Sequence, residues 1–367
     1  MTKKLLLITW MALALAACKS TEQPIASASS NKITPLQFNL YLEALLQQHD
    51  INALMSLYSI DKAITQRQIS RIQKTYGQQW AASYSETLFN AFADQNIQWV
   101  YQSSRPGGTN TVKTLFRGNS DDGFYFVEIE IDQRTYRIVD THDLAFKYST
   151  TTFLHQIADI AFCDVDRRLI CTVKDAYTGI LMAANEKNSQ AVIKHYRMLT
   201  EQQRALDLVR DLNSRLVSLH SDWLPTEFVS EVATDLSQYD SCSYNLESIL
   251  LAQKSFEKAL FCIDSAPTQV RHNAVMFLEK ASIYQEMQRY QTSIDMAHQA
   301  ISNEPTLPHS YIILLMSAAA EQDFELAVAT LNVLSERFSI EFDEPTLIEM
   351  FGNDDLINSD IYQSQQS

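Results

Sequence analysis

A helical spacing of apolar residues runs from Thr34 to about Phe92. Pro35 suits the first turn of a helix, and the apolar residues after it recur every three or four positions. Two later segments repeat this spacing, so we expect further helices at residues 69–76 and 84–92. The first helix has one apolar stripe, made of Phe38, Tyr41, Leu42, Leu45 and Leu46.

The period changes from helical to alternating near residue 97. Strands are predicted at about 97–101, 112–117, 124–132 and 135–140, with turns between them. The pattern predicts an antiparallel meander of four strands with one face open to water. Helices on its dry face would complete an α+β domain over residues 34–150. In the third strand, Tyr125, Val127, Ile129 and Ile131 share one face, and Glu128, Glu130 and Asp132 share the other.

Residues 151–239 have mostly helical patterns and are expected to form a helical connecting region. Thr200 and Gln203 have the spacing of a capping box, which predicts the start of a helix. Pro225 interrupts the pattern soon afterwards. The apolar residues of the expected helix are Leu206, Val209, Leu212 and Leu216.

Residues 240–340 repeat their pattern with a period of 34 residues. One phase of the repeat is aromatic, and a second phase, three positions later, is small. A C-terminal segment with a polar tail, residues 341–367, follows. The aromatic phase holds Phe256, Tyr290 and Phe324, and the small phase holds Ala259, Ser293 and Ala327.

This pattern resembles the tetratricopeptide repeat, with an aromatic residue before the second helix and small residues where helices cross. Residues 274–307 match it best, and Pro305 stands at the exit of that repeat. The resemblance implies stacked helix pairs whose first helices line a concave groove. The alternative is an irregular helical array with coincidental spacing. In the groove we expect Tyr244, Leu251, Leu278, Gln285, His309, Ile312 and Met316.

The expected groove is mildly apolar, which suits a helix or an extended peptide. It lacks the Lys, Arg and Asn residues with which related repeats hold a terminal carboxylate. The alternative occupant is part of the chain itself, either the C-terminal helix or a neighbouring domain. The sequence leaves both occupants open.

The N-terminus has the composition of a secretory signal. Lys3 and Lys4 precede an apolar run of 13 residues, whereas a membrane-spanning helix needs roughly 20. The run ends in Leu15-Ala16-Ala17-Cys18, which resembles the lipobox of bacterial lipoproteins. The resemblance implies a signal peptide at residues 1–17 and acylation of Cys18, with palmitate as a typical chain. Neither Lys19 nor Ser20 is the aspartate that retains lipoproteins at the inner membrane. In a Gram-negative cell, the resemblance therefore points to the periplasmic face of the outer membrane.

Residues 18–33 are rich in Ser, Ala, Thr and Gln and predict a flexible, lipidated tether with a reach of about 20 Å. Removing residues 1–17 takes away two lysines and no acid, which moves the net charge from −15 to −17. Nucleic-acid binding needs a basic footprint, so this charge argues against it. The same charge argues against contact of the protein body with anionic lipid, which leaves the lipid anchor as the expected membrane contact.

Four cysteines follow Cys18, and an oxidising periplasm favours disulfides between them. Cys163 and Cys171 would staple a hairpin, and Cys242 and Cys262 would join neighbouring helices of one repeat. Buried free thiols are the alternative. No close Cys/His grouping with the spacing of a zinc site occurs, so neither a metal nor another cofactor is expected.

Candidate catalytic residues are few in this sequence. His142 lies between Asp140 and Asp143 at a strand end, where an Asp-His pair would act as a general base. A loop histidine with local hydrogen bonds is the simpler interpretation. Trp99 and Tyr101 would line a pocket between sheet and helices, or belong to the core. We therefore expect a non-enzymatic scaffold or adaptor that binds another envelope protein.

The alternative function places a ligand-binding or hydrolytic site in the α+β domain. Its outline is similar to the cystatin-like and nuclear-transport-factor-like folds, in which helices pack on a curved sheet. That likeness rests on the order of elements over about a third of the chain.

Overall fold

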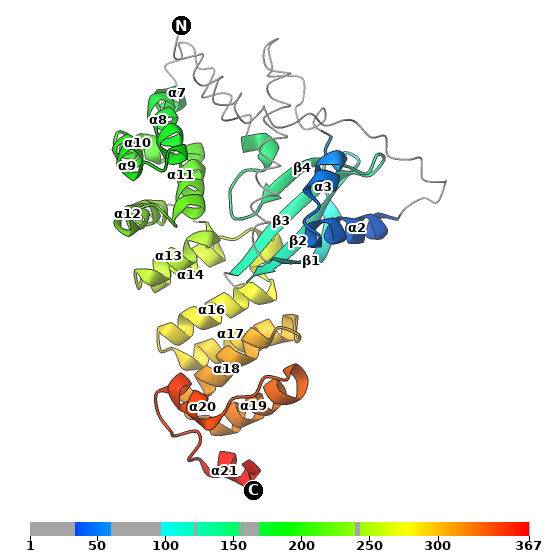
Figure 1. The fold of residues 1–367 in the computed structure, drawn as a ribbon, viewed down its shortest axis with the longest axis vertical. Coiled ribbons are helices and arrows are strands. Elements are labelled where there is room, and N and C mark those ends of the chain that lie inside the picture. The colour runs from blue at the N-terminus through cyan, green and yellow to red at the C-terminus, as the bar shows by residue number, and fades with distance from the viewer. Residues whose placement is uncertain are drawn as a thin grey trace. The chain divides into compact units, whose positions relative to one another are not determined.

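The computed structural model describes residues 34–59, 97–120, 123–153, 156, 169–238 and 243–366. The chain divides into two compact units, Met1–Phe228 and Val229–Ser367. The described part of the first unit holds a four-stranded sheet and helices, and that of the second holds helices (Figure 1). An α+β part followed by a helical array was expected from the sequence and is confirmed. The helices predicted at 69–76 and 84–92 lie outside the described residues.

The sheet is an antiparallel meander in the order β1-β2-β3-β4. Its strands are β1 (Gln98–Pro106), β2 (Thr111–Ser120), β3 (Gly123–Asp132) and β4 (Arg137–Asp143). The register shifts within β1 near Ser103 and between Glu130 and Ile131 of β3. Each strand is longer than, or offset from, its predicted range by a few residues, because the pairing continues into polar residues beside the turns.

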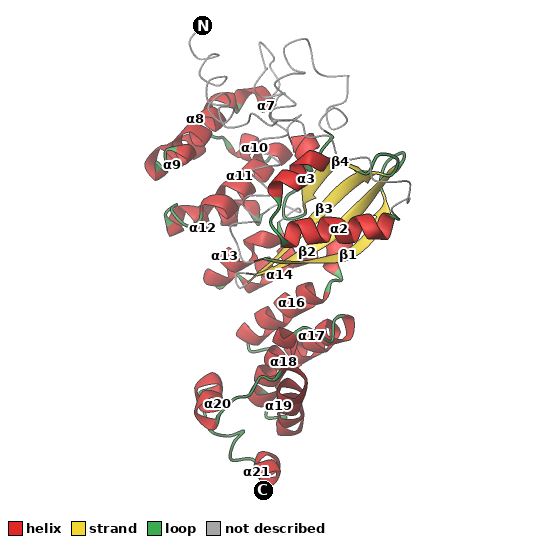
Figure 2. Ribbon diagram, turned by 45° about the vertical axis from the view of Figure 1, so that its right-hand side comes forward, coloured by secondary structure: helices red, strands yellow, loops and turns green. Residues whose placement is uncertain are grey.

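Two helices, α2 (Pro35–Gln47) and α3 (Ile51–Leu57), lie on one face of the sheet (Figure 2). A capping box starts α2: Gln37 N donates to Thr34 Oγ1, and Thr34 N donates to Gln37 Oε1. At the other end of α2, the backbone N of Trp99 donates to Gln47 Oε1 at 2.8 Å. The core between helices and sheet contains Phe38, Leu42, Leu45, Leu46, Leu54, Leu57, Tyr58, Ile97, Trp99, Phe116, Val127, Ile129, Ile131 and Ile138.

The predicted apolar stripe of α2 is wrong at Tyr41. Phe38, Leu42, Leu45 and Leu46 are buried, whereas Tyr41 is exposed. The sheet takes a face of α2 that is centred near Leu42, and Tyr41 lies about 100° away from Leu42 around the helix. The buried polar residue of this face is Asn39, which hydrogen-bonds to Ser104 and Thr114.

The second face of the sheet is buried at its centre and exposed along β1, where Val100 is 36% exposed and Arg105 is exposed, so the expectation of one wet face holds only in part. Phe126 is fully buried, Glu128 is 3% exposed, and Arg117 is 2% exposed. The alternating pattern placed these residues on the correct face. The alternating pattern could not show that the centre of this face is buried, because charged residues can be buried when they are paired, and their sequence pattern is then the same as that of an exposed surface.

The remaining helices of the first unit begin after the sheet. They are α7 (Leu169–Thr172), α8 (Lys174–Asn185), α9 (Ser189–Arg197), α10 (Glu201–Arg204) and α11 (Asp207–His220), and α12 (Thr226–Leu236) crosses into the second unit. The capping box of Thr200 and Gln203 is present. It starts only the four-residue α10, and the predicted long helix begins separately at Asp207.

The described part of the second unit continues with helices, of which the four longest, α16 to α19, follow one another in its middle. They are η1 (Tyr244–Leu246), α13 (Glu247–Ala252), α14 (Phe256–Asp264), α15 (Thr268–Arg271), α16 (Ala274–Glu286), α17 (Tyr290–Asn303), α18 (Pro308–Ala320), α19 (Phe324–Phe338), α20 (Glu344–Phe351) and α21 (Asp360–Gln366). The second helices of three pairs, α14, α17 and α19, begin at the three aromatic residues of the 34-residue period. The helical pairing therefore follows the period of the sequence.

The turn inside each of these helix pairs has the same backbone geometry. Lys254, Gln288 and Gln322 stand 34 positions apart, and each has a positive φ, between 55° and 64°. In each turn the next residue donates its backbone N–H back to the first helix, as Arg289 N does to Tyr284 O at 2.8 Å. Lys187, between α8 and α9, has the same left-handed conformation. None of the four is glycine, the residue that adopts this conformation at least cost.

Small residues lie where the helices of the array cross. Ala259, Ser293 and Ala327 are fully buried, as the small phase of the repeat predicts. The hydroxyl of Ser293 donates to Ala281 O at 2.7 Å and lies 2.8 Å from the hydroxyl of Ser317. A side chain with more atoms at these positions would separate the helices.

The two helices of the C-terminal segment pack on the last helix pair of this unit. α20 packs against α18, and α21 packs against α19. Leu347, Leu356 and Tyr362 of this segment belong to the same core as Leu314 and Leu334. Among the described residues, no helix is both long and apolar enough to cross a membrane.

Candidate interaction face and buried polar clusters

The residues expected in the groove differ in their exposure. Tyr244 and Leu278 are buried, His309 is exposed, and the other four, Leu251, Gln285, Ile312 and Met316, are half-buried. His309, Ile312 and Met316 lie three and four positions apart on α18, so they share one side of that helix. We call these three residues, together with Ile348 of α20, the α18 patch.

Ile348 is included in the patch because it is exposed on α20, which lies beyond the repeat that the sequence indicated. It lies on α20, which packs against α18, and it is 39% exposed. Its position is 36 residues after Ile312, which is close to the 34-residue period. The sequence pattern did not identify it, because α20 lacks the aromatic and small residues of the repeat.

A pair of glutamates lies on the first helices of neighbouring pairs. Burial raises the pKa of Glu279, on α16, to about 7. Burial, together with the negative charge of Glu279, raises the pKa of Glu247, on α13, to about 8. Glu247 stands one period before Ala281, so a carboxyl occupies a place that the next repeat fills with a methyl group.

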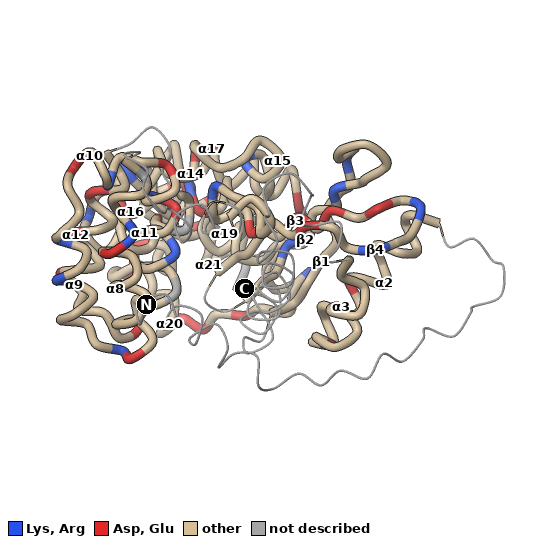
Figure 3. The backbone as a smooth tube through the Cα atoms, turned by 90° about the horizontal axis from the view of Figure 1, so that it is seen from above, with Lys and Arg blue, Asp and Glu red and all other residues tan. Residues whose placement is uncertain are grey.

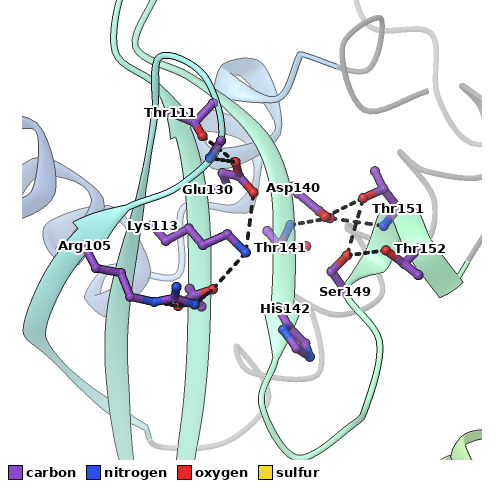
Figure 4. A network of polar contacts seen from close by, with 12 residues as sticks. Arg105, Thr111, Lys113, Glu130, Asp140, Thr141, His142, Ser149, Thr151 and Thr152 are labelled. Carbon is purple, nitrogen blue, oxygen red and sulfur yellow. Dashed lines mark hydrogen bonds and ion pairs between the residues drawn. The ribbon is translucent and has the colours of Figure 1, made fainter. Parts of the chain in front are cut away.

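Charged side chains form a network on the second face of the sheet (Figure 4). Arg105 donates from Nε to Glu128 Oε2 at 2.9 Å and from Nη2 to Glu128 Oε1 at 3.0 Å. Lys113 Nζ lies 3.3 Å from Glu128 and 3.6 Å from Glu130. Thr111 donates its hydroxyl proton to Glu130. The buried Glu128 carboxylate thus contacts two cations, which offsets the cost of its burial.

Asp140 and His142 hydrogen-bond to other residues, so Asp140 does not orient the imidazole as it would in a general base. Asp140 accepts hydrogen bonds from Thr151 N at 3.1 Å, from the Thr151 hydroxyl, and from Thr141 N at 2.8 Å. It therefore caps the helical turn that follows Thr150 (Figure 4). His142 Nε2 donates to Phe146 O at 2.9 Å, and burial lowers the pKa of its imidazole. The arrangement is that of a neutral histidine that holds a loop.

A second buried cluster joins the end of β4 to α11. Arg215 Nε donates to Asp211 Oδ2 at 2.8 Å, and Arg215 Nη2 donates to Tyr148 O at 3.2 Å. Lys147 N donates to the other Asp211 oxygen at 2.7 Å. The Arg215 guanidinium also lies over the rings of Phe146 and Phe153, at 4.1 and 4.2 Å.

Asp143 lies near this second cluster and adds a second carboxyl group beside Arg215. Burial raises the pKa of Asp143 to about 6, with a smaller opposing effect from its hydrogen bond to Ala145 N. Two carboxyls therefore share one guanidinium, that of Arg215. The sequence did not indicate this cluster, because its members are about 70 residues apart and belong to no motif.

The other candidate residues have structural surroundings or lie outside the described part. Trp99 belongs to the core, and the Tyr101 hydroxyl lies 3.2 Å from Ser104 Oγ. Cys171 and Cys262 are both disulfide-bonded. Their expected partners Cys163 and Cys242 lie outside the described residues, as does Cys18, so the pairings and the lipidation stay predictions. Within the described ranges, no group of three or more His, Cys, Asp or Glu is placed to hold a metal ion.

Comparison with known proteins does not identify a class for this fold or its surfaces. No family model matches the chain, and no curated protein and no solved structure matches it either. Its function must therefore be inferred from the chain itself.

Proposed function

We propose that this protein is a non-enzymatic scaffold of the bacterial cell envelope. Cys18 anchors it by lipid to the periplasmic face of the outer membrane, and residues 18–33 tether the folded part. The helical array holds another envelope protein, which it contacts as a helix or an extended peptide at the α18 patch.

The accessible apolar side chains of the α18 patch carry this proposal. Ile312 and Met316 are half-buried, and Ile348 is 39% exposed, on helices that pack against each other in a regular array. Stacked helix pairs expose extended surfaces of this kind, and apolar anchors three or four residues apart match the spacing of an amphipathic helix. Tyr244 and Leu278 are buried, and the neighbouring accessible residues of the expected groove, His309, Ile312 and Met316, lie together on α18.

Site-specific photo-crosslinking in the native host tests the interaction. A photoreactive amino acid replaces Ile312 in the full chain, and a matched variant carries it at Gln299, an exposed residue of α17. We expect one reproducible crosslinked protein from position 312 and none from position 299. Met316→Glu should weaken binding of that protein without lowering the melting temperature, because Met316 is half-buried, whereas Ile312 also packs against the core. Equal crosslinking at both positions would contradict a specific patch.

Cell fractionation tests the anchor separately. Cys18→Ser removes the acylated thiol, so the protein should leave the membrane fraction and appear in the soluble periplasmic fraction. Ser20→Ala is the matched control and should stay with the outer membrane. Retention of the Cys18→Ser protein in the membrane would refute the lipid anchor.

A further inference from the structure

The outward side of α2 is apolar and exposed. Leu36 is 55% exposed, Leu40 is 51% exposed and Tyr41 is 46% exposed. Leu36 and Leu40 are one helical turn apart, so their side chains are neighbours, and Ala44 continues the same side. Three large apolar side chains on a 13-residue helix form an exposed patch rather than scattered residues.

The other side of α2 fixes the helix against the sheet, so the patch cannot rotate inward. Phe38 and Leu42 belong to the core. Asn39 Nδ2 donates to Ser104 Oγ at 2.9 Å, and the Thr114 hydroxyl donates to Asn39 Oδ1 at 3.1 Å. Because the inner side is held in the core, the outer side faces away from the described part of the fold.

The charge of α2 distinguishes it from the rest of the chain. Charged residues make up 20% of the sequence, yet Glu43 is the only one in this helix. Figure 3 shows α2 drawn almost entirely in the colour of uncharged residues. A body with a net charge of −17 after removal of residues 1–17 is repelled by anionic lipid least where its surface carries few charges. The outer side of α2 is such a surface, with Glu43, three positions after Leu40, as its single charge.

The position of α2 along the chain indicates which surface lies next to its outer side. Cys18 precedes Pro35 by only 17 positions. A flexible chain of that length has a typical reach of about 20 Å. If Cys18 is acylated, α2 is thus the described element nearest to the lipid along the chain and stays within a short distance of the bilayer surface.

We infer that Leu36, Leu40 and Tyr41 insert into the surface of the phospholipid bilayer that holds Cys18, and this inference rests on the proposed lipid anchor. Apolar helix faces lie at the boundary of headgroups and acyl chains, about 5–10 Å deep, and tyrosine favours that boundary. The helix adds a second membrane contact to the acyl chains. Two contacts fix the orientation of the first unit on the membrane, whereas a tether alone leaves it free.

Depth-dependent quenching of fluorescence tests this contact. Tyr41→Trp is made in the full, lipidated chain, which is reconstituted into phosphatidylcholine vesicles with bromine atoms on the acyl chains. Met198→Trp is the matched control, because Met198 is 56% exposed at the end of α9. Relative to the parent protein, the emission added by Tyr41→Trp should shift to the blue and lose about half its intensity, as expected for a ring at the depth of the acyl boundary. The emission added by Met198→Trp should be unchanged.

Leu40→Glu in the Tyr41→Trp background should abolish the quenching while the protein stays bound to vesicles through its lipid. Absence of quenching in Tyr41→Trp, with retention on vesicles, would overturn the inference and leave the anchor intact. Loss of retention would instead refute the proposed anchor. Absence of quenching together with dimers in sedimentation would assign the outer side of α2 to a second copy of the chain, which also overturns the inference.

Discussion

The two units differ in how they accommodate polar groups in their interiors. In the first unit, a few charged residues, such as Glu128 and Arg215, are buried with specific partners. In the second unit, the crossings are filled by alanine and serine at repeated positions, and Glu247 is an exception. Paired buried charges depend on every partner, whereas repeated small residues depend only on volume. Single substitutions should therefore have larger effects in the first unit.

The largest effect is expected for Arg215→Ala. It leaves the Asp211 and Asp143 carboxyls without their shared cation, which should lower the free energy of unfolding by about 3–5 kcal/mol. The matched change in the second unit is Lys280→Ala, which breaks the exposed ion pair with Asp264 and should cost less than about 1 kcal/mol. Urea denaturation of both variants measures the difference. Similar costs would refute the contrast between the units.

Gly179→Ala should destabilise the first unit by about 1–3 kcal/mol. A Cβ atom at Gly179 would lie 2.3 Å from the ring of His195, so α8 and α9 would have to separate. Gly108→Ala is the control, because its Cβ would meet its nearest atom at an ordinary 3.6 Å. Thermal unfolding compares the two variants, and an unchanged melting temperature for Gly179→Ala would show that the ring moves freely.

Glu279→Gln should stabilise the second unit at pH 8 by about 1–2 kcal/mol and have little effect at pH 5. The pKa values of Glu247 and Glu279 are raised from 4.5 to about 8 and about 7, so the folded state holds protons that the unfolded chain releases. The stability contributed by this pair is then greatest below about pH 4.5 and falls as the pH rises towards 8. Glu286→Gln, at an exposed position of the same helix, is the control. A pH-independent effect of Glu279→Gln would contradict the buried pair.

The smallest effect is expected in the turns of the array. Gln288→Gly should stabilise the second unit by about 0.5–1 kcal/mol, because glycine adopts the φ of 58° without strain. Gln299→Gly, in the middle of α17, should instead destabilise it by about 1 kcal/mol. Chemical denaturation resolves the opposite signs, and a loss of stability in both variants would show that the turn is not strained.

The strands and the helices of the array could be predicted from periods in the sequence. The buried clusters of charged residues could not. The period of two placed the four strands, and the period of 34 placed α14, α17 and α19 at their aromatic first residues. The pattern also assigned Glu128 to the correct face of the sheet. Whether a residue on that face is buried depends on its packing against residues far away in sequence. The cluster of Asp143 and Arg215 arises for the same reason, since only the folded chain brings β4 to α11.

Of the residues that the repeat predicted to line the groove, only some are accessible to a partner. His309, Ile312 and Met316 could be predicted because they follow the spacing of one helix. Leu278 has the same repeat position as Ile312, yet it is 5% exposed. Ile348 was missed because α20 keeps the geometry of the array without its sequence signature. Position in a repeat thus predicts which side of a helix a residue occupies, and tertiary packing decides whether a partner can reach it.

The polar end of the array has a consequence for solubility. α21 buries Tyr362 against the array and exposes Gln363 and Ser364. A stack of helix pairs that ended at α19 would present an apolar surface suited to the first pair of another molecule, and such head-to-tail contacts grow into filaments. α20 and α21 cover part of that surface, because α20 packs against α18 and α21 packs against α19. A chain without the C-terminal segment should therefore associate head to tail, which sedimentation would detect.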